Sequence, residues 1–407
     1  MNGKLSFITN FHNFDSDEDF FKYISQLKID NKDFPCKKAE EFVKNFSKSI
    51  LLDQNSRAFP ELIVLANFFK REKIFLSSDI NKNKFIQVPL GKTFHIAPSN
   101  VDTIFLYSSL IALLCGNICL IRVSSNQNPQ LDFVIDKLNT ALSNHMLMQE
   151  RLLLFNYEHD AEITKRISNL VESRVIWGGD DTVKQIRSIP MNPLAREIVF
   201  PNRFSLTIIK SSSILKSQIV SKDTIKGFFN DTNYFNQQAC SSPKLIIWLG
   251  SDKDNSQARN IFWNQYQSFI SANITNDTPG MAMDRFVASS FYTANDLVFN
   301  NLSKNDYPMR LEIKDSSSPL IRESHPGNGL FLEMEKNSID GIAKEMRDID
   351  QTLSHIGLSE KDITNLAMQI TNRGVDKIVP VGKALDFNII WDGYDLVEQF
   401  SRKIVVN

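Results

Sequence analysis

Cys240 is the residue of this 407-residue chain whose setting best suits nucleophilic chemistry. It lies in the polar run Asn236-Gln237-Gln238-Ala239-Cys240-Ser241-Ser242-Pro243, just before the apolar stretch from Lys244 to Leu249. A thiol in a polar loop at the start of a strand can meet solvent and substrate, and it can form a covalent intermediate. The alternative is a small buried hydrophobe, the usual state of a free cysteine and the one that we expect for Cys115 and Cys119. Local context alone leaves both interpretations of Cys240 open.

A second candidate is Asn100, in the turn Pro98-Ser99-Asn100-Val101 between an expected strand and a long apolar helix. An Asn amide at a helix start can donate a hydrogen bond to an oxyanion, which contributes roughly 3 kcal/mol to a transition state. The alternative is that Ser99 or Asn100 caps the helix, as such residues commonly do. The two residues leave room for one cap and one residue that faces a ligand.

Arg122, Ser124 and Ser125 form a candidate nucleotide-binding segment at the end of an expected buried strand. A guanidinium and two hydroxyls at the carboxyl end of a parallel strand can bind a ribose or a phosphate. An arginine at a strand end can also simply reach solvent, so this segment by itself is a weak indication.

Trp177, Gly178 and Gly179 form a second candidate segment, followed by Asp180-Asp181. Two glycines between a strand and a helix let the backbone approach a pyrophosphate, and the helix start attracts anions. Asp180 and Asp181 could equally serve as helix caps. The segment does not carry three spaced glycines, which disfavours a Rossmann oxidoreductase of the common kind.

The elements that must position these residues follow an α/β pattern. Residues 1–80 carry apolar positions at helical spacing, which predicts a helical cover. From Phe85 onward, strand-like runs alternate with amphipathic segments, as in a parallel sheet whose ligands bind at the carboxyl ends of the strands. The expected strands are Thr93 to Ala97, Cys119 to Val123, Leu152 to Phe155, Arg174 to Trp177, Ile198 to Phe200, Leu206 to Ile209, Lys244 to Leu249, Leu330 to Glu333 and Ile378 to Val381.

The composition narrows the function classes. With 42% hydrophobic and 23% charged residues and a formal net charge of -1, nothing demands nucleic acid or an anionic membrane. The 4 cysteines lack the spacing of a disulfide framework or a zinc site, so we expect no metal and a cytoplasmic location. The N-terminus lacks the apolar core of a secretory signal, and we expect an uncleaved start. Residues 104–121 are mostly apolar, but Gly116-Asn117 divides them into a helix and a strand rather than a membrane span.

Taken in order, these motifs resemble the aldehyde dehydrogenase superfamily, and most closely its acyl-reductase branch, the LuxC-type long-chain fatty acyl reductases. The resemblance covers roughly residues 85 to 407. Pro98-Ser99-Asn100 looks like the family's oxyanion turn, Gly116-Asn117 through Ser125 like its cofactor segment, Trp177-Gly178-Gly179 like its Thr-Gly-Ser turn, and Gln237-Gln238-Ala239-Cys240 like the Gly-Gln-x-Cys around its nucleophile. The runs Arg373 to Gly382 and Trp391 to Asp395 suggest the acyl-reductase branch.

The resemblance implies an aldehyde-dehydrogenase-like fold of two α/β domains with a short C-terminal oligomerisation strand. We place a helical cover and a Rossmann-like NAD(P)-binding domain at residues 1–212, a catalytic thiol domain at 213–385, and the tail at 386–407. Cys240 would hold an acyl group from acyl-CoA or an acyl-protein, Asn100 would hold the oxyanion, and NADPH would reduce the thioester to an aldehyde. An acyl-protein synthetase is an expected partner, and the protein is expected to be a homo-oligomer.

Departures from the family pattern point toward thioester reduction with NADPH. Arg122 replaces the usual Lys, and Ser125 stands where a ribose-binding Glu is common. Val199 falls at or next to the position of the hydrolytic Glu, although a shift of two residues would put Glu197 there. The alternatives are an NAD(P)-dependent aldehyde dehydrogenase that forms the free acid, and a non-catalytic scaffold with the same fold.

Overall fold

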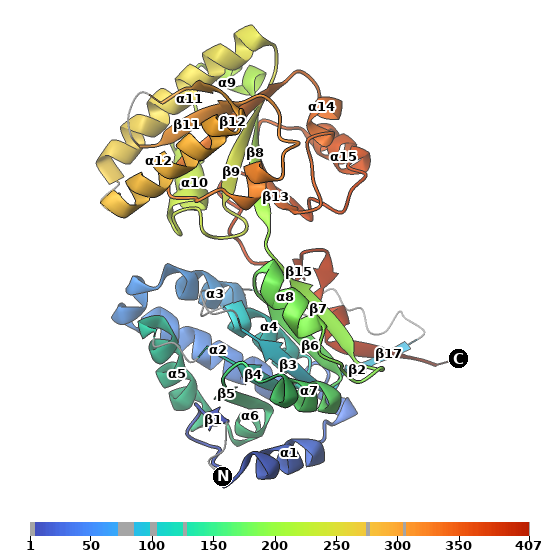
Figure 1. Cartoon of the computed structure of the whole chain (residues 1–407). Coiled ribbons are helices and arrows are strands. Elements are labelled where there is room, and N and C mark those ends of the chain that lie inside the picture. Colours follow the sequence, from blue (N-terminus) through green and yellow to red (C-terminus); the bar gives the residue numbers. More distant parts are fainter. Residues whose placement is uncertain are drawn as a thin grey trace. The chain divides into compact units, whose positions relative to one another are not determined.

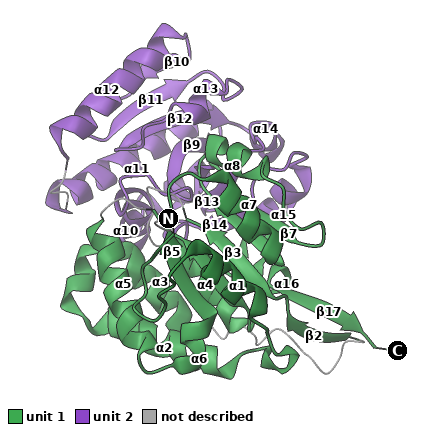
Figure 2. Cartoon of the chain, turned by 60° about the horizontal axis from the view of Figure 1, so that its bottom comes forward, with its two compact units in different colours: residues 1–202, 387–407 green, residues 203–386 purple. Residues whose placement is uncertain are grey.

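The computed structural model describes residues 5–71, 85–97, 104–124, 128–273, 277–303 and 307–406. It divides into two compact units, residues 1–202 with 387–407 (unit 1) and residues 203–386 (unit 2) (Figure 2). Each unit has a mainly parallel sheet covered by helices, as Figure 1 shows. The predicted α/β class with two domains is therefore confirmed.

Unit 1 is built on a six-stranded sheet in the order β1-β5-β4-β3-β6-β7. The β1–β5 pair is antiparallel and the other neighbours are parallel. The central strands are almost wholly buried, because helices cover both faces of a parallel sheet. The strands are β1 (Ser6–Phe7), β3 (Lys92–Ile96), β4 (Ile118–Arg122), β5 (Leu152–Asn156), β6 (Ser173–Trp177) and β7 (Arg196–Phe200).

The helices of unit 1 divide between the two faces of this sheet. Alternate residues of β4 enter separate cores: Cys119 and Ile121 pack with α2, α4 and α5, and Ile118 and Leu120 pack with α1 and α7. The predicted helical cover corresponds to α1, α2 and α3. The helices are α1 (Asp17–Gln26), α2 (Lys37–Leu52), α3 (Pro60–Arg71), α4 (Ile104–Leu114), α5 (Pro129–Leu142), α6 (Met146–Arg151), α7 (Ala161–Leu170), α8 (Asp180–Arg187) and α16 (Leu396–Gln399).

Residues 104–121 form the buried helix α4 and the buried strand β4, as the Gly116-Asn117 division predicts. The α4 helix is apolar all round because it lies inside the core of unit 1. Across the described part of the chain, none of the helices combines the length and the apolar character that crossing a membrane requires.

Unit 2 is built on a seven-stranded sheet in the order β10-β11-β12-β9-β8-β13-β14, parallel except for the β10–β11 pair. The strands are β8 (Phe204–Lys210), β9 (Pro243–Leu249), β10 (Val298–Asn301), β11 (Met309–Ile313), β12 (Leu330–Lys336), β13 (Asp350–Ile356) and β14 (Lys377–Pro380). The helices are α9 (Ser211–Ser217), α10 (Lys222–Asn233), α11 (Asp252–Asn273), α12 (Pro279–Ala294), α13 (Leu320–Glu323), α14 (Ile339–Ala343) and α15 (Glu360–Gln369).

The boundary between the units differs from the predicted one. The prediction grouped Leu206 to Ile209 with the first domain and began the second at residue 213, whereas unit 2 begins at Arg203. The reason is that β8 pairs with β9 and β13 in the second sheet. Only residues 201–203 separate β7 from β8, and a parallel crossover within one sheet needs about a dozen residues.

The C-terminal segment belongs to unit 1 and ends in β17 (Ser401–Val405). This strand pairs antiparallel with β2 (Phe85–Pro89) of the same chain, and a short hairpin of β15 (Ile390–Trp391) and β16 (Tyr394–Asp395) precedes it. The C-terminal strand therefore pairs within the chain, and its expected role in oligomerisation stays a prediction.

Candidate active site

Cys240 lies exposed in the loop that joins α10 to β9. The loop turns sharply, because Asn236 and Gln237 adopt left-handed backbone angles with φ of 49° and 60°. Such angles cost of order 1–3 kcal/mol for residues other than glycine and persist only where surrounding contacts impose them. The loop is therefore a constrained element, and its contacts show what constrains it.

The buried amide of Gln237 anchors this loop. Its Nε2 donates to the carbonyls of Pro243 at 2.9 Å and Leu330 at 3.1 Å, and its Oε1 accepts from the N–H of Gly329 at 2.8 Å. One side chain thereby ties the loop to the start of β9 and to β12. The sequence had indicated Gln237 only as part of the motif before Cys240.

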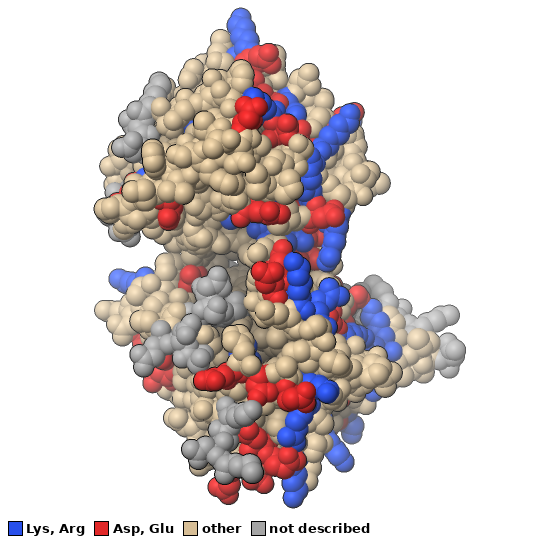
Figure 3. Space-filling view, viewed as in Figure 1, with Lys and Arg blue, Asp and Glu red and all other residues tan. Residues whose placement is uncertain are grey.

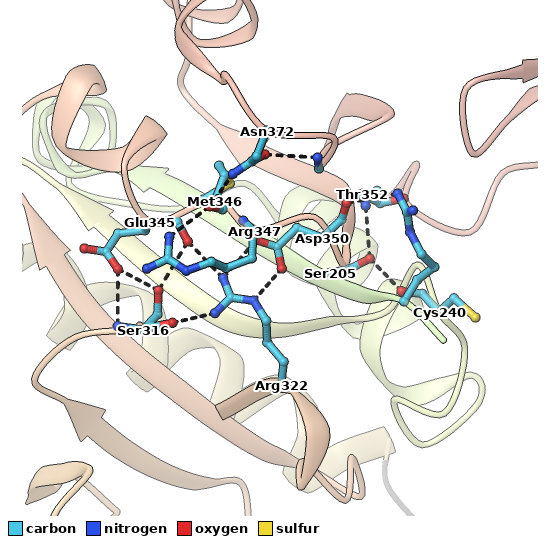
Figure 4. A network of polar contacts seen from close by, with 12 residues as sticks. Ser205, Cys240, Ser316, Arg322, Glu345, Met346, Arg347, Asp350, Thr352 and Asn372 are labelled. Carbon is cyan, nitrogen blue, oxygen red and sulfur yellow. Dashed lines mark hydrogen bonds and ion pairs between the residues drawn. The ribbon is translucent and has the colours of Figure 1, made fainter. Parts of the chain in front are cut away.

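A hydrogen bond to its backbone carbonyl holds Cys240 in position. Ser205 Oγ donates to the Cys240 carbonyl at 2.6 Å and accepts from the N–H of Thr352 at 3.2 Å. Figure 4 shows these bonds, with the sulfur pointing away from Ser205. The β8 and β13 strands thus fix the position of the residue, and sequence reasoning did not identify Ser205 because a single serine in a strand carries no motif.

A second loop, residues 325–329, supports the Cys240 loop. The Asn328 N–H donates to the Asn236 carbonyl at 2.8 Å, and Gln238 Nε2 donates to the Pro326 carbonyl at 2.7 Å. Gly327 has φ +71°, and a Cβ there would lie 2.7 Å from the Asn236 oxygen. Only glycine fits both the backbone angle and the close approach. The two loops therefore form one hydrogen-bonded structure.

Lys244, four residues after Cys240, is a cation whose charge acts on the thiol. Its Nζ lies 5.9 Å from the centroid of the Phe204 ring, and no described carboxylate forms an ion pair with it. Burial lowers the pKa of Lys244, and the negative charge of a Cys240 thiolate acts in the opposite direction. An ammonium and a nearby thiolate stabilise each other, so Lys244 is suited to support a thiolate at Cys240.

His325, in the loop that supports the Cys240 loop, is not suited to act as a base. Burial, and then the charge of Lys244, lower the pKa of His325 well below its ordinary value. Its Nδ1 accepts from the N–H of Gly327 at 3.0 Å, and its ring packs edge-on against Phe204. The imidazole is therefore neutral near pH 7 and serves to hold its loop.

Replacing Lys244 by methionine should move the pH profile of Cys240 alkylation upward by about one unit, because the thiolate loses a cation. The measurement is the rate of iodoacetamide modification against pH, read at Cys240 by mass spectrometry. Lys244→Arg should retain most of the parent profile. Lys253→Met, at an exposed lysine of α11, is the matched control, and a shift as large in that variant would assign the effect to overall charge.

Arg122 is at the carboxyl end of β4, as predicted. Its Nη2 donates to the Tyr157 carbonyl at 3.2 Å, and its guanidinium lies 4.7 Å from the Tyr157 ring centroid. Its Nε is buried and makes no hydrogen bond to the described residues. Ser124 follows in a half-exposed position. Ser125 and Asn100 lie outside the described residues, and their roles stay predictions.

Gly178 and Gly179 join β6 to α8. Gly179 is the N-cap residue of α8 and provides no side-chain cap, and Asp180 accepts from the Asn202 N–H rather than capping the helix. The first-turn N–H groups of α8 therefore have no side-chain cap and suit an anion. The first turn also carries the carboxylates of Asp180 and Asp181, and the roles of Arg122, Gly178 and Gly179 in binding a cofactor stay predictions.

Trp177 differs from the other predicted cofactor residues because its side chain is in the core. The indole is 7% exposed and stacks on Phe200 at 3.7 Å between centroids, with its Nε1 donating to Ser108. The structure thus gives its side chain a packing role. Any contact with a cofactor at this residue would have to come from the backbone.

Glu197, the alternative candidate for a hydrolytic base, neutralises a buried arginine. Its Oε1 accepts from Arg174 Nη2 at 2.5 Å, and its Oε2 accepts from Arg187 Nε at 3.0 Å. The Arg174 side chain is 1% exposed, so the ion pair compensates a charge in the interior. This geometry gives Glu197 a structural role in unit 1.

Comparisons with known proteins point to the same family as the sequence motifs. A family model described as acyl-CoA reductase (LuxC) matches residues 2–261. The long-chain acyl-protein thioester reductase of Aliivibrio fischeri is 23% identical over 209 residues, which cover 51% of this chain and 40% of that protein. The corresponding reductase of Photorhabdus luminescens is 24% identical over 310 residues, covering 73% and 61%. The chain spans less than two thirds of the length of these curated relatives.

Solved structures show the fold. A lactaldehyde dehydrogenase superposes with a TM-score of 0.67 at 12% identity, covering 95% of this chain and 89% of that one. The NAD-dependent aldehyde dehydrogenase from Sinorhizobium meliloti gives 0.67 at 11% identity, covering 94% and 85%. The expected aldehyde-dehydrogenase-like fold is confirmed.

Proposed function

Because the chain belongs to the LuxC family of acyl-CoA reductases, we propose that it reduces an acyl thioester to an aldehyde through a thioester on Cys240. The observation that carries this proposal is an exposed thiol whose backbone is fixed by Ser205 and Gln237 and on which the charge of Lys244 acts. The relatives named long-chain acyl-protein thioester reductases support an acyl-protein donor, and the family description supports acyl-CoA.

The chemistry begins at the Cys240 sulfur. The thiolate attacks the carbonyl carbon of the donor thioester, a new C–S bond forms, and the donor sulfur leaves as a thiolate. Addition of a hydride to the same carbon then gives a tetrahedral oxyanion. When that oxyanion re-forms the carbonyl, the C–S bond to Cys240 breaks, which releases the aldehyde and restores the thiolate.

A reduced nicotinamide nucleotide supplies the hydride when it is bound. In unit 1 the first-turn N–H groups of α8 would hold its pyrophosphate, with Gly178 and Gly179 allowing the approach. Arg122 would hold a 2′-phosphate at the end of β4 through charge-assisted hydrogen bonds, and Ser124 would contact the ribose. This arrangement favours NADPH over NADH.

Arg122→Ala should reduce the preference for NADPH over NADH by about tenfold or more, because a charge-assisted bond to a phosphate contributes roughly 1.5–3 kcal/mol. The measurement is kcat/KM for each cofactor. Arg187→Ala, at an exposed arginine at the other end of α8, is the control and should leave the ratio unchanged. Equal efficiency with the two cofactors in the parent protein would contradict the assignment.

The experiment that tests the function follows NADPH absorbance with a series of acyl-CoA thioesters and identifies the product. We expect one aldehyde per NADPH consumed. The principal rival is an aldehyde dehydrogenase, which needs a base to activate water. Glu197 is engaged by two arginines and Val199 cannot accept a proton, so neither favours hydrolysis. Release of free acid with formation of NADPH from an aldehyde would establish the rival, and no turnover in either direction would favour a scaffold.

A further inference from the structure

A cavity of about 310 Å³ opens on the surface of unit 2 between α12 and the segment that follows α13. The residues that α12 contributes are spaced at i, i+3, i+4 and i+7, so they lie along one face of the helix. The lining residues are Asp284, Val287, Ala288, Phe291, Ser324 and Pro326. The lining is mainly apolar, and Asp284 is its only charged member.

Several large apolar side chains of the α12 helix are exposed. Its buried side chains are Arg285, Ala288 and Tyr292. Val287 is 57% exposed and Phe286 is 62% exposed, and Met283 and Phe291 are exposed as well. Figure 3 shows few charged side chains over this helix. Two residues of this exposed apolar set, Val287 and Phe291, line the cavity, and exposed apolar surface can provide a binding site for a ligand.

A wall of the cavity is hydrogen-bonded to the Cys240 loop. The wall residue Pro326 accepts a hydrogen bond from Gln238, two residues before the nucleophile. Asn328 Nδ2 donates to Asp284 at 2.9 Å, and buried Arg285 donates to the Asn328 carbonyl at 2.7 Å. The 325–329 loop therefore connects α12 to the Cys240 loop through hydrogen bonds on both sides.

We infer that this groove binds the alkyl chain of the acyl group that Cys240 carries. The inference rests on the proposed function and names the site that would recognise its substrate. An alkyl chain fits because the lining offers methyl, methylene and aromatic groups and no cation for an anionic ligand. The carboxylate of Asp284 accepts a hydrogen bond from Asn328, so the rest of the lining is mainly apolar side chains.

A groove of this chemistry should select for chain length. Each methylene transferred from water to an apolar site increases affinity about fourfold, which corresponds to roughly 0.8 kcal/mol. The preference should rise steadily from butanoyl-CoA upward and should level off once the groove is filled. Val287→Asp places a carboxylate in the lining and should reduce the tetradecanoyl-to-butanoyl ratio of kcat/KM by about tenfold or more.

A binding measurement separates the groove from the reaction. The probe is cis-parinaric acid, whose fluorescence reports an apolar site, titrated into the Cys240→Ala protein. We expect Val287→Asp and Phe291→Asp to weaken binding at least about tenfold. Phe286→Asp is the matched control, because it introduces the same charge at an exposed position of α12 that does not line the cavity.

The outcomes distinguish the groove from the proposed function. Aldehyde formation with a chain-length preference that survives Val287→Asp would overturn the groove and leave the function standing. Selective loss of parinarate binding in a protein that reduces no thioester would support the groove and contradict the function. Equal loss in all three variants, or a change in oligomeric state by light scattering without a change in binding, would overturn the groove.

Discussion

Replacing Cys240 by alanine should abolish the acyl-enzyme and lower aldehyde formation by about four orders of magnitude or more, because the step that accepts the acyl group has no other nucleophile. The fold should survive the change. The thiol is exposed, and the hydrogen bond from Ser205 goes to the backbone carbonyl, which alanine keeps. The measurements are covalent attachment of a radiolabelled acyl group and single-turnover reduction.

The other cysteines provide the control, because all are buried. Burial raises the pKa of Cys119 to about 12 and raises that of Cys115 well above its ordinary value, so both remain protonated thiols near pH 7. Cys119→Ala should keep full acyl labelling. Persistent labelling and turnover in Cys240→Ala would show that the nucleophile is elsewhere.

Replacing Asp350 by alanine should destabilise unit 2 by about 3–5 kcal/mol, because the change leaves a buried arginine without its counter-ion. Arg322 donates to both carboxylate oxygens of Asp350 at 2.7 and 2.8 Å, and the two side chains are 3% and 0% exposed (Figure 4). Asp350 also accepts from the Arg347 N–H at 2.8 Å. The measurement is urea unfolding of the full chain.

Two further variants test whether burial of the ion pair causes the loss of stability. The double variant Asp350→Leu with Arg322→Met should lose less stability than Asp350→Ala, because it removes both charges. Lys314→Ala breaks an exposed ion pair with Asp296 in the same unit and should change stability by less than about 1 kcal/mol. A similar small loss from Asp350→Ala would contradict the role given to the buried pair.

The same buried pair reaches the candidate nucleophile through β13. Asp350 begins this strand, and Thr352, two residues later, donates its N–H to Ser205, which holds the Cys240 carbonyl. We therefore expect Asp350→Ala to slow acyl transfer even under conditions where unit 2 stays folded.

Apolar runs in the sequence predicted most strands of the two large sheets, because a parallel strand that is buried on both faces is apolar along its whole length. This pattern missed β1, β10, β11 and β13, and the last of these contains Asp350, Gln351, Thr352 and Ser354, all buried. Partners distant in the sequence satisfy the side chains of two of them: Arg322 donates to Asp350, and Thr207 forms a 2.7 Å hydrogen bond with Ser354. A local hydropathy pattern does not identify such a strand, because the hydrogen-bond partners that stabilise its polar side chains belong to other elements.

The sequence by itself determined the fold class, the family resemblance and the candidate nucleophile, because each depends on residues close together in the chain. Cys240 stands out through its polar loop and the motif before it, and Arg122 through its place at a strand end. Only the tertiary structure decided that the charge of Lys244 acts on the thiol and that Trp177 packs into the core. Only the tertiary structure showed that Glu197 neutralises Arg174. It also showed that α12 is hydrogen-bonded to the 325–329 loop, which supports the Cys240 loop. Lys244 is close to Cys240 in the sequence, but its burial, like that of Trp177 and Arg174, arises only when the chain folds. The other facts rest on contacts between segments that are apart in the sequence, which also form only on folding.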